Sequence, residues 1–248
     1  IAWYPFDGNA SDMSGNGNHG TVYGATLGTD RFREENRSYN FDGVDDWIIV
    51  SNSANILNEG DVFSSFLWVK INLYRSNQSI FGKAVDQVGN WTNFRDWGFY
   101  GGTGSLGTGV TADAELGVNG SLFSVSSNSE IAYDWLHLGM SWDGVRLILY
   151  FNGERINEIT GSLEPYGLGH SHNVTFAKGG SNFLNGSIDD ARIYSRVLTL
   201  EEVIELYEFE KVGDTPLTDS NFHDAIALWF DAEENATAIY GHISDWNT

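Results

Sequence analysis

Two apolar segments bracket most of this chain. Residues 3–6 stand near its start, and residues 188–194 follow only after a long stretch of turn residues and short β-type runs. In an all-β chain this order favours a sheet whose first and last strands pair. We therefore expect a β-sandwich closed by its two ends, with the remaining strands supplied by the sequence between them.

The composition supports this class. The chain has 248 residues with 29 Gly, 3 Pro, 9 Trp, 11 Tyr and 15 Phe, which is typical of aromatic strands joined by tight turns. A single sandwich of roughly 200–250 residues is ordinary and buries a core that needs no disulfide. The absence of cysteine is consistent with this and does not assign a cellular compartment.

Several strands can be placed from their patterns. Residues 63–73 alternate, with Phe66 and Trp68 expected on one face and Leu67 and Val69 on the other. Asn-Gly at 119–120 predicts a hairpin, and Asp-Gly at 143–144 with Asn-Gly at 152–153 predicts a three-strand run over 135–159. Residues 39–41 and 47–50 are predicted to pair around the turn at 42–45.

One helix is expected after the last strand. Thr199 is a candidate N-cap with Glu202 three residues later, the spacing of a capping box. The composition then changes at a Gly-Asp-Thr-Pro linker over 213–216. We expect a sandwich domain over 1–210 and a small α/β extension over 211–248, which is too short to bury a core alone.

The charge balance restricts the partners. With 34 acidic and 13 basic residues the net charge is −21, which argues against nucleic acid and anionic membrane surfaces. No apolar run approaches the roughly 18–20 residues of a membrane-spanning helix, so no membrane insertion is expected. Ile1 is not a natural start, so we expect a fragment from which an export signal could have been removed.

Four motifs in order resemble one family. They are Ala-Trp-Tyr-Pro-Phe-Asp-Gly at 2–8, Phe-Asp-Gly-Val-Asp-Asp-Trp at 41–47, Trp-Asp-Gly at 142–144 with Leu-Tyr-Phe-Asn-Gly at 149–153, and Ile-Asp-Asp-Ala-Arg-Ile-Tyr-Ser-Arg-Val-Leu at 188–198. Over about residues 1–208 the chain resembles the bacterial laminin-G-like (LamG) family. The resemblance implies an all-β, concanavalin A-like jelly roll of two antiparallel sheets. It also implies a calcium-containing module that binds carbohydrate or another ligand in a secreted or cell-surface multidomain protein.

The tail resembles something different. Residues 222–248, which end in Tyr-Gly-His-Ile-Ser-Asp-Trp-Asn-Thr, are similar to the lead-in of BspA-type surface-protein repeats. This would place the remainder of a larger surface polypeptide after the sandwich.

A cation site is expected where the end strands meet. Calcium takes 6 to 8 oxygens from carboxylates, amides and backbone carbonyls. The candidate ligands are Asp7, Asp12, Asn16, Asn18, the Gly43 carbonyl, Asp189 and Asp190. Neighbouring strand residues point to opposite faces, so only one of the last two points at the seam unless a bulge intervenes. Resemblance to jelly-roll glucanases favours Asp190 and LamG proteins favour Asp189, so both are kept. The alternative is that these side chains only make Asx turns.

A ligand surface is expected around residues 90–100. Aromatic rings flanked by polar side chains suit the flat faces and hydroxyl rims of sugars. The candidates are Trp91, Arg95, Asp96 and Trp97. The alternative is that alternate rings fill the core.

Catalytic and other metal patterns are weaker. Glycosidases need two carboxyl groups a few ångströms apart, and the Glu-x-Asp-x-x-Glu strand of jelly-roll glucanases is absent. Asp113 with Glu115 is the nearest acidic pair, and His170 with His172 lacks a third metal ligand. The sequence therefore predicts a non-catalytic binding module for a glycan or cell-surface ligand. The alternatives are a polysaccharide-acting enzyme of the same fold and a structural adhesin spacer.

Overall fold

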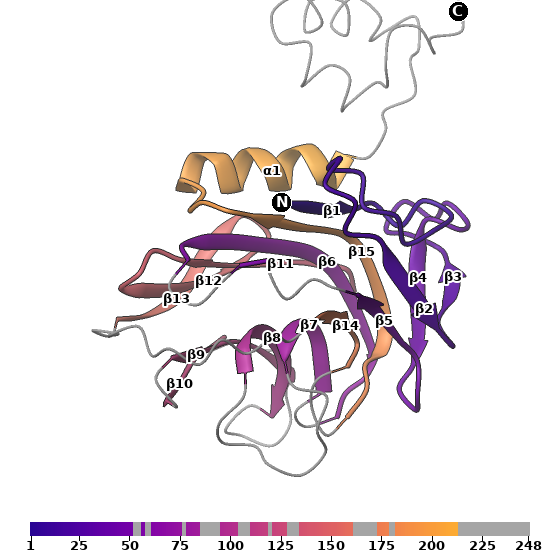
Figure 1. Cartoon of the computed structure of the whole chain (residues 1–248), viewed down its shortest axis with the longest axis horizontal. Helices are drawn as coiled ribbons and strands as arrows, with labels where there is room; N and C mark the ends of the chain where they lie inside the picture. The colour runs from indigo at the N-terminus through magenta and orange to yellow at the C-terminus, as the bar shows by residue number, and fades with distance from the viewer. Residues whose placement is uncertain are drawn as a thin grey trace, which may run out of the picture.

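The computed structural model describes residues 1–51, 56–57, 61–75, 78–84, 95–103, 110–118, 121–127, 134–160, 173–178 and 182–212. Two antiparallel sheets pack face to face, and a helix covers the outer face of one of them (Figure 1). The all-β sandwich expected from the sequence is confirmed. The predicted extension after residue 212 and the pair His170 and His172 lie outside the described residues.

Sheet A contains both the first and the last strand of the sandwich. Its strands run in the order β13 (Glu154–Thr160), β12 (Arg146–Phe151), β11 (Leu136–Trp142), β6 (Phe63–Leu73), β15 (Asn185–Tyr194), β4 (Ser38–Asp42) and β3 (Thr26–Gly28), with β1 (Ala2–Tyr4) also paired to β15. The β1–β15 register matches Ala2 with Ile193 and Tyr4 with Ala191. The predicted pairing of the first and last strands is therefore confirmed.

Sheet B lies opposite. Its order is β10 (Ser121–Ser126), β9 (Val110–Val118), β8 (Arg95–Thr103), β7 (Gln78–Ala84), β14 (Val174–Phe176), β5 (Trp47–Val50) and β2 (Gly20–Tyr23). The predicted hairpin around 119–120 is confirmed, because Val118 pairs with Ser121. The predicted run over 135–159 is confirmed as β11, β12 and β13.

One predicted pairing is wrong. β4 pairs with β15 and β3 in sheet A, whereas β5 pairs with β14 and β2 in sheet B. The turn between them therefore crosses from one sheet to the other instead of closing a hairpin. The residues of β4 alternate in polarity and those of β5 are all apolar, and neither pattern says which partner a strand takes. Gly43, with φ of +78°, permits this sharp crossing.

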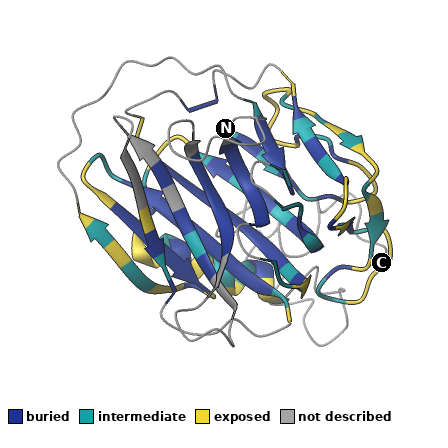
Figure 2. Ribbon diagram, turned by 90° about the horizontal axis from the view of Figure 1, so that it is seen from below, coloured by how far each residue is buried: buried dark blue, intermediate teal, exposed yellow. Residues whose placement is uncertain are grey.

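The core follows the period-two pattern. On β6, Leu67, Val69 and Ile71 are each at most 5% exposed and face sheet B, and Phe66 belongs to the cluster on the opposite face. Aromatic rings fill the space between the sheets, with Phe81 stacked on Phe176 at 4.4 Å between centroids. Figure 2 shows burial concentrated along the strands and exposure in the turns.

Helix α1 (Leu200–Val212) begins with the predicted capping box. The Thr199 amide donates to Glu202 Oε2 at 2.8 Å, and the Glu202 amide donates to Thr199 Oγ1 at 3.2 Å. The helix buries Val203 in a small cluster with Phe66 and Tyr150 on the outer face of sheet A. Within the described residues, no helix has the length and apolar character needed to cross a bilayer.

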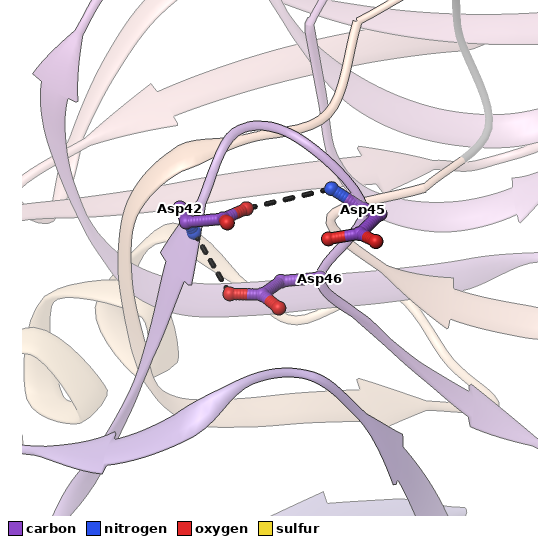
Figure 3. Close-up of side chains that lie close together, drawn as sticks. All are labelled: Asp42, Asp45 and Asp46. Atoms are coloured by element: carbon purple, nitrogen blue, oxygen red, sulfur yellow. Dashed lines mark hydrogen bonds between the residues drawn. The ribbon is translucent and has the colours of Figure 1, made fainter.

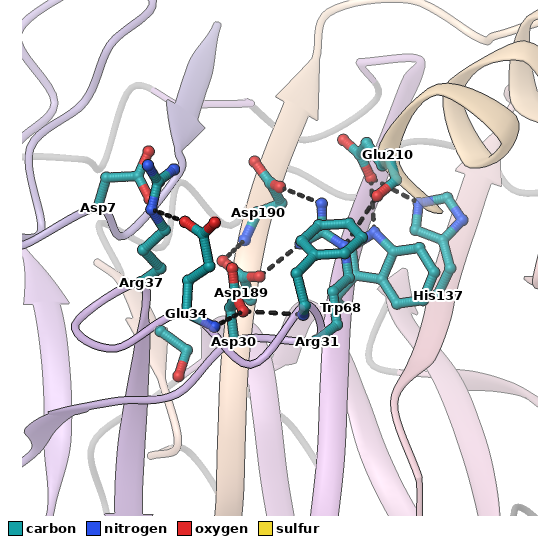
Figure 4. Close-up of polar contacts among 12 residues, drawn as sticks. Asp7, Asp30, Arg31, Glu34, Arg37, Trp68, His137, Asp189, Asp190 and Glu210 are labelled. Carbon is teal, nitrogen blue, oxygen red and sulfur yellow. Dashed lines mark hydrogen bonds and ion pairs between the residues drawn. The ribbon is translucent and has the colours of Figure 1, made fainter. Parts of the chain in front are cut away.

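Glu210 holds the last turn of α1 on the sheet (Figure 4). It is 2% exposed, and its carboxylate accepts from Arg192 Nε at 2.5 Å and Trp68 Nε1 at 2.9 Å, with His137 Nε2 at 3.3 Å. Burial raises the pKa of Glu210, but Arg192, His137 and Arg31 together outweigh it and lower this pKa to about 2. Sequence reasoning did not find this contact, because Glu210 lies among other helix glutamates.

We expect Thr199→Ala to lower the free energy of unfolding by about 1 kcal/mol, because the hydrogen bond from the Glu202 amide to Thr199 Oγ1 is lost. Urea unfolding at pH 7 measures the change. Thr199→Ser keeps the oxygen and should stay close to the parent. Equal stability of the Ala and Ser variants would show that the Thr199 hydroxyl does not stabilise the helix.

The Glu210 contact predicts a pH dependence. Its folded pKa of about 2 lies below the ordinary 4.5, so its stabilisation is complete above pH 4.5 and is lost as the pH falls toward 2. The shift corresponds to about 3 kcal/mol at neutral pH. Glu210→Gln should remove this contribution from the stability profile measured by urea unfolding between pH 7 and 3. Glu208→Gln, which removes only an exposed pair with Lys211, is the control and should keep the parent profile.

Candidate functional site

A bulge brings both seam aspartates to one side of β15. The β15–β6 register shifts between Asp189 and Arg192, and Asp190 has φ of +41°. The ordinary alternation of neighbouring side chains is thereby broken. As Figure 4 shows, both carboxylates meet Arg31.

Arg31 is buried between these carboxylates and the helix. Its Nη1 pairs with Asp189, its Nη2 lies 2.8 Å from Asp190 Oδ2, and its Nε donates to the Glu210 carbonyl at 2.8 Å. The side chains of Arg31 and Asp189 are 8% and 3% exposed. Burial, followed by the charge of Asp190, raises the pKa of Asp189 well above its usual range, and Arg31 opposes both effects.

The predicted ligands Asp12, Asn16 and Asn18 form a separate group around the first residues. Asp12 Oδ1 accepts the amides of Trp3 and Ser14 at 3.0 and 2.9 Å, and Oδ2 accepts the Asn18 amide at 2.9 Å. Burial raises the pKa of Asp12, but these hydrogen bonds lower it by more. The side-chain Nδ2 atoms of Asn16 and Asn18 donate to the Ile1 carbonyl at 2.9 and 3.1 Å.

Trp3 links this group to the seam. Its backbone amide donates to Asp12, and its indole Nε1 donates to Asp190 Oδ1 at 3.1 Å. Asp7 is exposed, with its carboxylate 3.5 Å from Arg37. The seven candidate ligands therefore do not surround one point.

Gly43 lies elsewhere along the sheet. Its carbonyl accepts from Arg75 Nη1 at 2.6 Å, and it packs beside Asn185. Asn185 and Asp189 are four residues apart on β15, about 13 Å at the usual strand rise. Gly43 is therefore remote from the seam carboxylates.

A different set of carboxylates gathers around Gly43. Asp42, Asp45 and Asp46 each offer an oxygen, and these atoms lie within 4.8 Å of one another (Figure 3). We call this set the acidic turn. Burial and the charges of Asp42 and Asp45 raise the pKa of Asp46. Sequence reasoning took only Gly43 from this segment, although the Asp-Gly-Val-Asp-Asp spacing was visible.

An aromatic pair adjoins the acidic turn at the β2 edge of sheet B. Tyr23 and Trp47 are paired in register and stack at 4.6 Å between centroids with 13° between planes. Lys178 Nζ lies 3.5 Å from the Trp47 centroid, and Tyr23 is 48% exposed. We call these three residues the aromatic platform.

The platform faces outward. The strand neighbours of its two rings, Val22 and Ile48, pack into the core. Asp46 Oδ2 accepts the Asp42 amide at 3.0 Å, and its Oδ1 lies against Gly24, directly after Tyr23. A carboxylate oxygen therefore lies against the residue that follows Tyr23.

The predicted ligand residues around 90–100 are placed only in part. Trp97 is 2% exposed and packs between the sheets, with Phe63 and Phe81 each at 5.4 Å between centroids. This is the core position that the sequence analysis kept as the alternative. Arg95 and Asp96 lie at the start of β8, and their side chains, like all of Trp91, are outside the described residues.

Similar folds are found among solved structures. The fourth domain of AbnA, a GH43 extracellular arabinanase from Geobacillus stearothermophilus, solved in complex with arabinotriose, matches with a TM-score of 0.64 and 17% identity. The match covers 83% of this chain and 97% of that domain. The receptor-binding domain of a botulinum neurotoxin C/D mosaic serotype matches with a TM-score of 0.65 and 19% identity over 85% of this chain. The chain spans about half of that toxin domain, 51% of its length.

A toxin relative solved with a protein bound also matches. The binding domain of botulinum neurotoxin DC in complex with rat synaptotagmin II has a TM-score of 0.60 and 18% identity, covering 84% of this chain and 51% of that one. At these identities the likeness shows the fold alone. A search of curated proteins finds no match, and nothing in the comparisons supports the BspA-type resemblance of the tail.

The family model described as the concanavalin A-like lectin/glucanases superfamily matches residues 42–204. That interval runs from the acidic turn to the first turn of α1 and includes the bulged strand with both seam aspartates. Together with the two-sheet architecture, it shows that the chain belongs to the laminin G-like family of this superfamily.

Proposed function

We propose that this chain is a non-catalytic module that binds carbohydrate at the aromatic platform, as part of a secreted or cell-surface protein. The observation that carries the proposal is the stacked Tyr23–Trp47 pair at the edge of sheet B, in which Tyr23 is exposed and Trp47 is half-buried beneath it. An aromatic ring offers a flat apolar face to the C–H face of a sugar. The oxygens of the adjoining acidic turn can accept from sugar hydroxyls.

The platform is organised before any ligand arrives. Trp47 is in contact with Tyr23 and with the ammonium of Lys178, and its strand pairs with β2 and β14. Less side-chain freedom is then lost on binding, and binding is tighter. The AbnA domain, which shares the fold and was solved with arabinotriose, supports a sugar as the class of ligand.

The charge of the chain favours a neutral glycan. At a net charge of −21 the surface repels sulfated and uronate-rich polysaccharides, and this repulsion weakens with salt. A neutral oligosaccharide meets no such barrier. Arabinotriose is therefore a suitable first probe.

We expect Tyr23→Ala and Trp47→Ala each to weaken binding at least tenfold, equivalent to about 1.4 kcal/mol, because the first removes the exposed ring and the second removes the ring on which it stacks. A neutral glycan array finds the best ligand, and calorimetry with that ligand or arabinotriose measures Kd. Tyr23→Phe keeps the ring and should bind within a few fold of the parent. Leu73→Ala, at an exposed site on sheet A, is the control.

Two outcomes would count against this assignment. If Trp91→Ala or Arg95→Ala abolishes binding while Tyr23→Ala and Trp47→Ala do not, the ligand lies at residues 90–100. If no glycan binds, the carbohydrate proposal fails. New reducing ends from neutral polysaccharides, assayed in parallel, would overturn the non-catalytic role and favour the enzyme alternative.

Calcium remains part of the proposal, at the acidic turn. Its three carboxylates supply the kind of oxygen ligands that calcium takes. We expect the parent to bind calcium in a calorimetric titration and Asp45→Asn/Asp46→Asn to lose that binding. Asp7→Asn is the matched control and should retain it. Unchanged calcium binding by the double variant would contradict the placement.

A further inference from the structure

We infer that Arg31 takes the place of a metal ion at the seam, where Asp190 binds both Arg31 and the indole of Trp3 in the first strand. Family resemblance predicted calcium at Asp189 and Asp190. In the structure both carboxylates bind one guanidinium instead. A planar guanidinium, whose N–H donors have a fixed geometry, is well suited to donate hydrogen bonds to two neighbouring carboxylate oxygens.

The chain positions Arg31 with a dedicated turn. Asp30 Oδ1 accepts the amides of Phe32 and Glu34, each at 2.8 Å, which closes the loop around Arg31. The loop also contains Arg33 at φ +72° and Asn36 at φ +64°, two left-handed residues that keep it compact. The guanidinium is thus held by backbone geometry as well as by its ion pairs.

The surroundings of Arg31 complete an internal cation site. Phe32 and Trp68 lie over the guanidinium, with centroids 4.4 and 4.9 Å from its carbon. Its Nε donates to the Glu210 carbonyl in the last turn of α1, where a positive charge is favourable. One side chain therefore connects β15 to the C-terminal end of the helix.

The charges nearby are consistent with this role. Arg31 forms ion pairs with Asp189 and Asp190. Arg192 forms an ion pair with Glu210, and its Nη2 also lies 3.8 Å from Asp190 Oδ1. The other predicted ligands are engaged elsewhere, so an ion in place of Arg31 would bind the two carboxylates and water. Asp12 accepts three backbone amides, and the Gly43 carbonyl accepts from Arg75 far along the strand.

The consequence is a seam whose stability is independent of calcium. A metal ion leaves when its concentration falls, whereas Arg31 belongs to the chain. The first strand and α1 should therefore stay in place when calcium is removed, whatever the acidic turn or the platform binds.

The test uses thermal melting in 1 mM CaCl2 and in EDTA. Asp45→Asn/Asp46→Asn serves as the parent, so that calcium at the acidic turn does not contribute. This parent should melt at the same temperature in both conditions. Adding Arg31→Ser leaves two buried carboxylates without their partner and opens space between them. That variant should melt lower in EDTA and regain about 5–10 °C in calcium, as expected for a site about 100-fold saturated.

Two controls keep the test decisive. Arg37→Ser removes an arginine with a 39% exposed side chain and should show no calcium response. Arg31→Lys keeps the positive charge but loses the paired donors of the guanidinium. This variant should fold even if the Ser variant does not. It should melt below the parent and show no change on adding calcium.

Three results would overturn the inference. The first is a parent that melts lower in EDTA, with the difference abolished by adding Asp189→Asn/Asp190→Asn, which would place calcium at the seam. The second is a folded Arg31→Ser variant with no calcium response. The third is an Arg31→Lys variant that melts higher in calcium than in EDTA.

Discussion

A guanidinium buried between two neighbouring carboxylates is the interaction on which the arrangement of this domain depends. The Asp190 carboxylate accepts hydrogen bonds from both Arg31 and the indole of Trp3, and Arg31 also donates to a carbonyl in the last turn of α1. Strand β1, strand β15 and the helix thus meet in one polar cluster between sheet A and the helix (Figure 1). Burying such charges is costly, and it is tolerated here because each carboxylate has partners.

The bulge in β15 makes this possible. A regular strand would send Asp189 and Asp190 to opposite faces, and one of them would point away from Arg31. The positive φ of Asp190 turns both toward the same guanidinium. The local strain at Asp190 is offset by the ion pairs of both carboxylates with Arg31.

Much of the fold was predictable from sequence, because it rests on local patterns. The alternation of β6, the capping box at Thr199 and the pairing of the two ends all follow from residue spacing. The separation of β4 and β5 into different sheets was missed, because the residue pattern of a strand leaves its partner open. The bulge was left open as a possibility, since nothing in Asp-Asp-Ala-Arg specifies a register shift.

The site was harder to predict than the fold. Tyr23 and Trp47 are distant in sequence and meet only because β2 pairs with β5, so the motif that ends at Trp47 does not point to Tyr23. Trp97 resembled a binding-loop residue by composition, yet it lies in the core. Arg31 gave no signal, because its role depends on a loop that folds over a bulge. Long-range contacts of this kind require strand order, and one sequence does not supply it.

Native-state hydrogen exchange on Arg31→Lys is the most direct test of the structural role of Arg31. If one guanidinium joins the chain ends to the helix, amides of β1 and α1 should lose protection together while those of β9 keep theirs. Loss confined to the helix, or no change in either element, would contradict the central role given to Arg31.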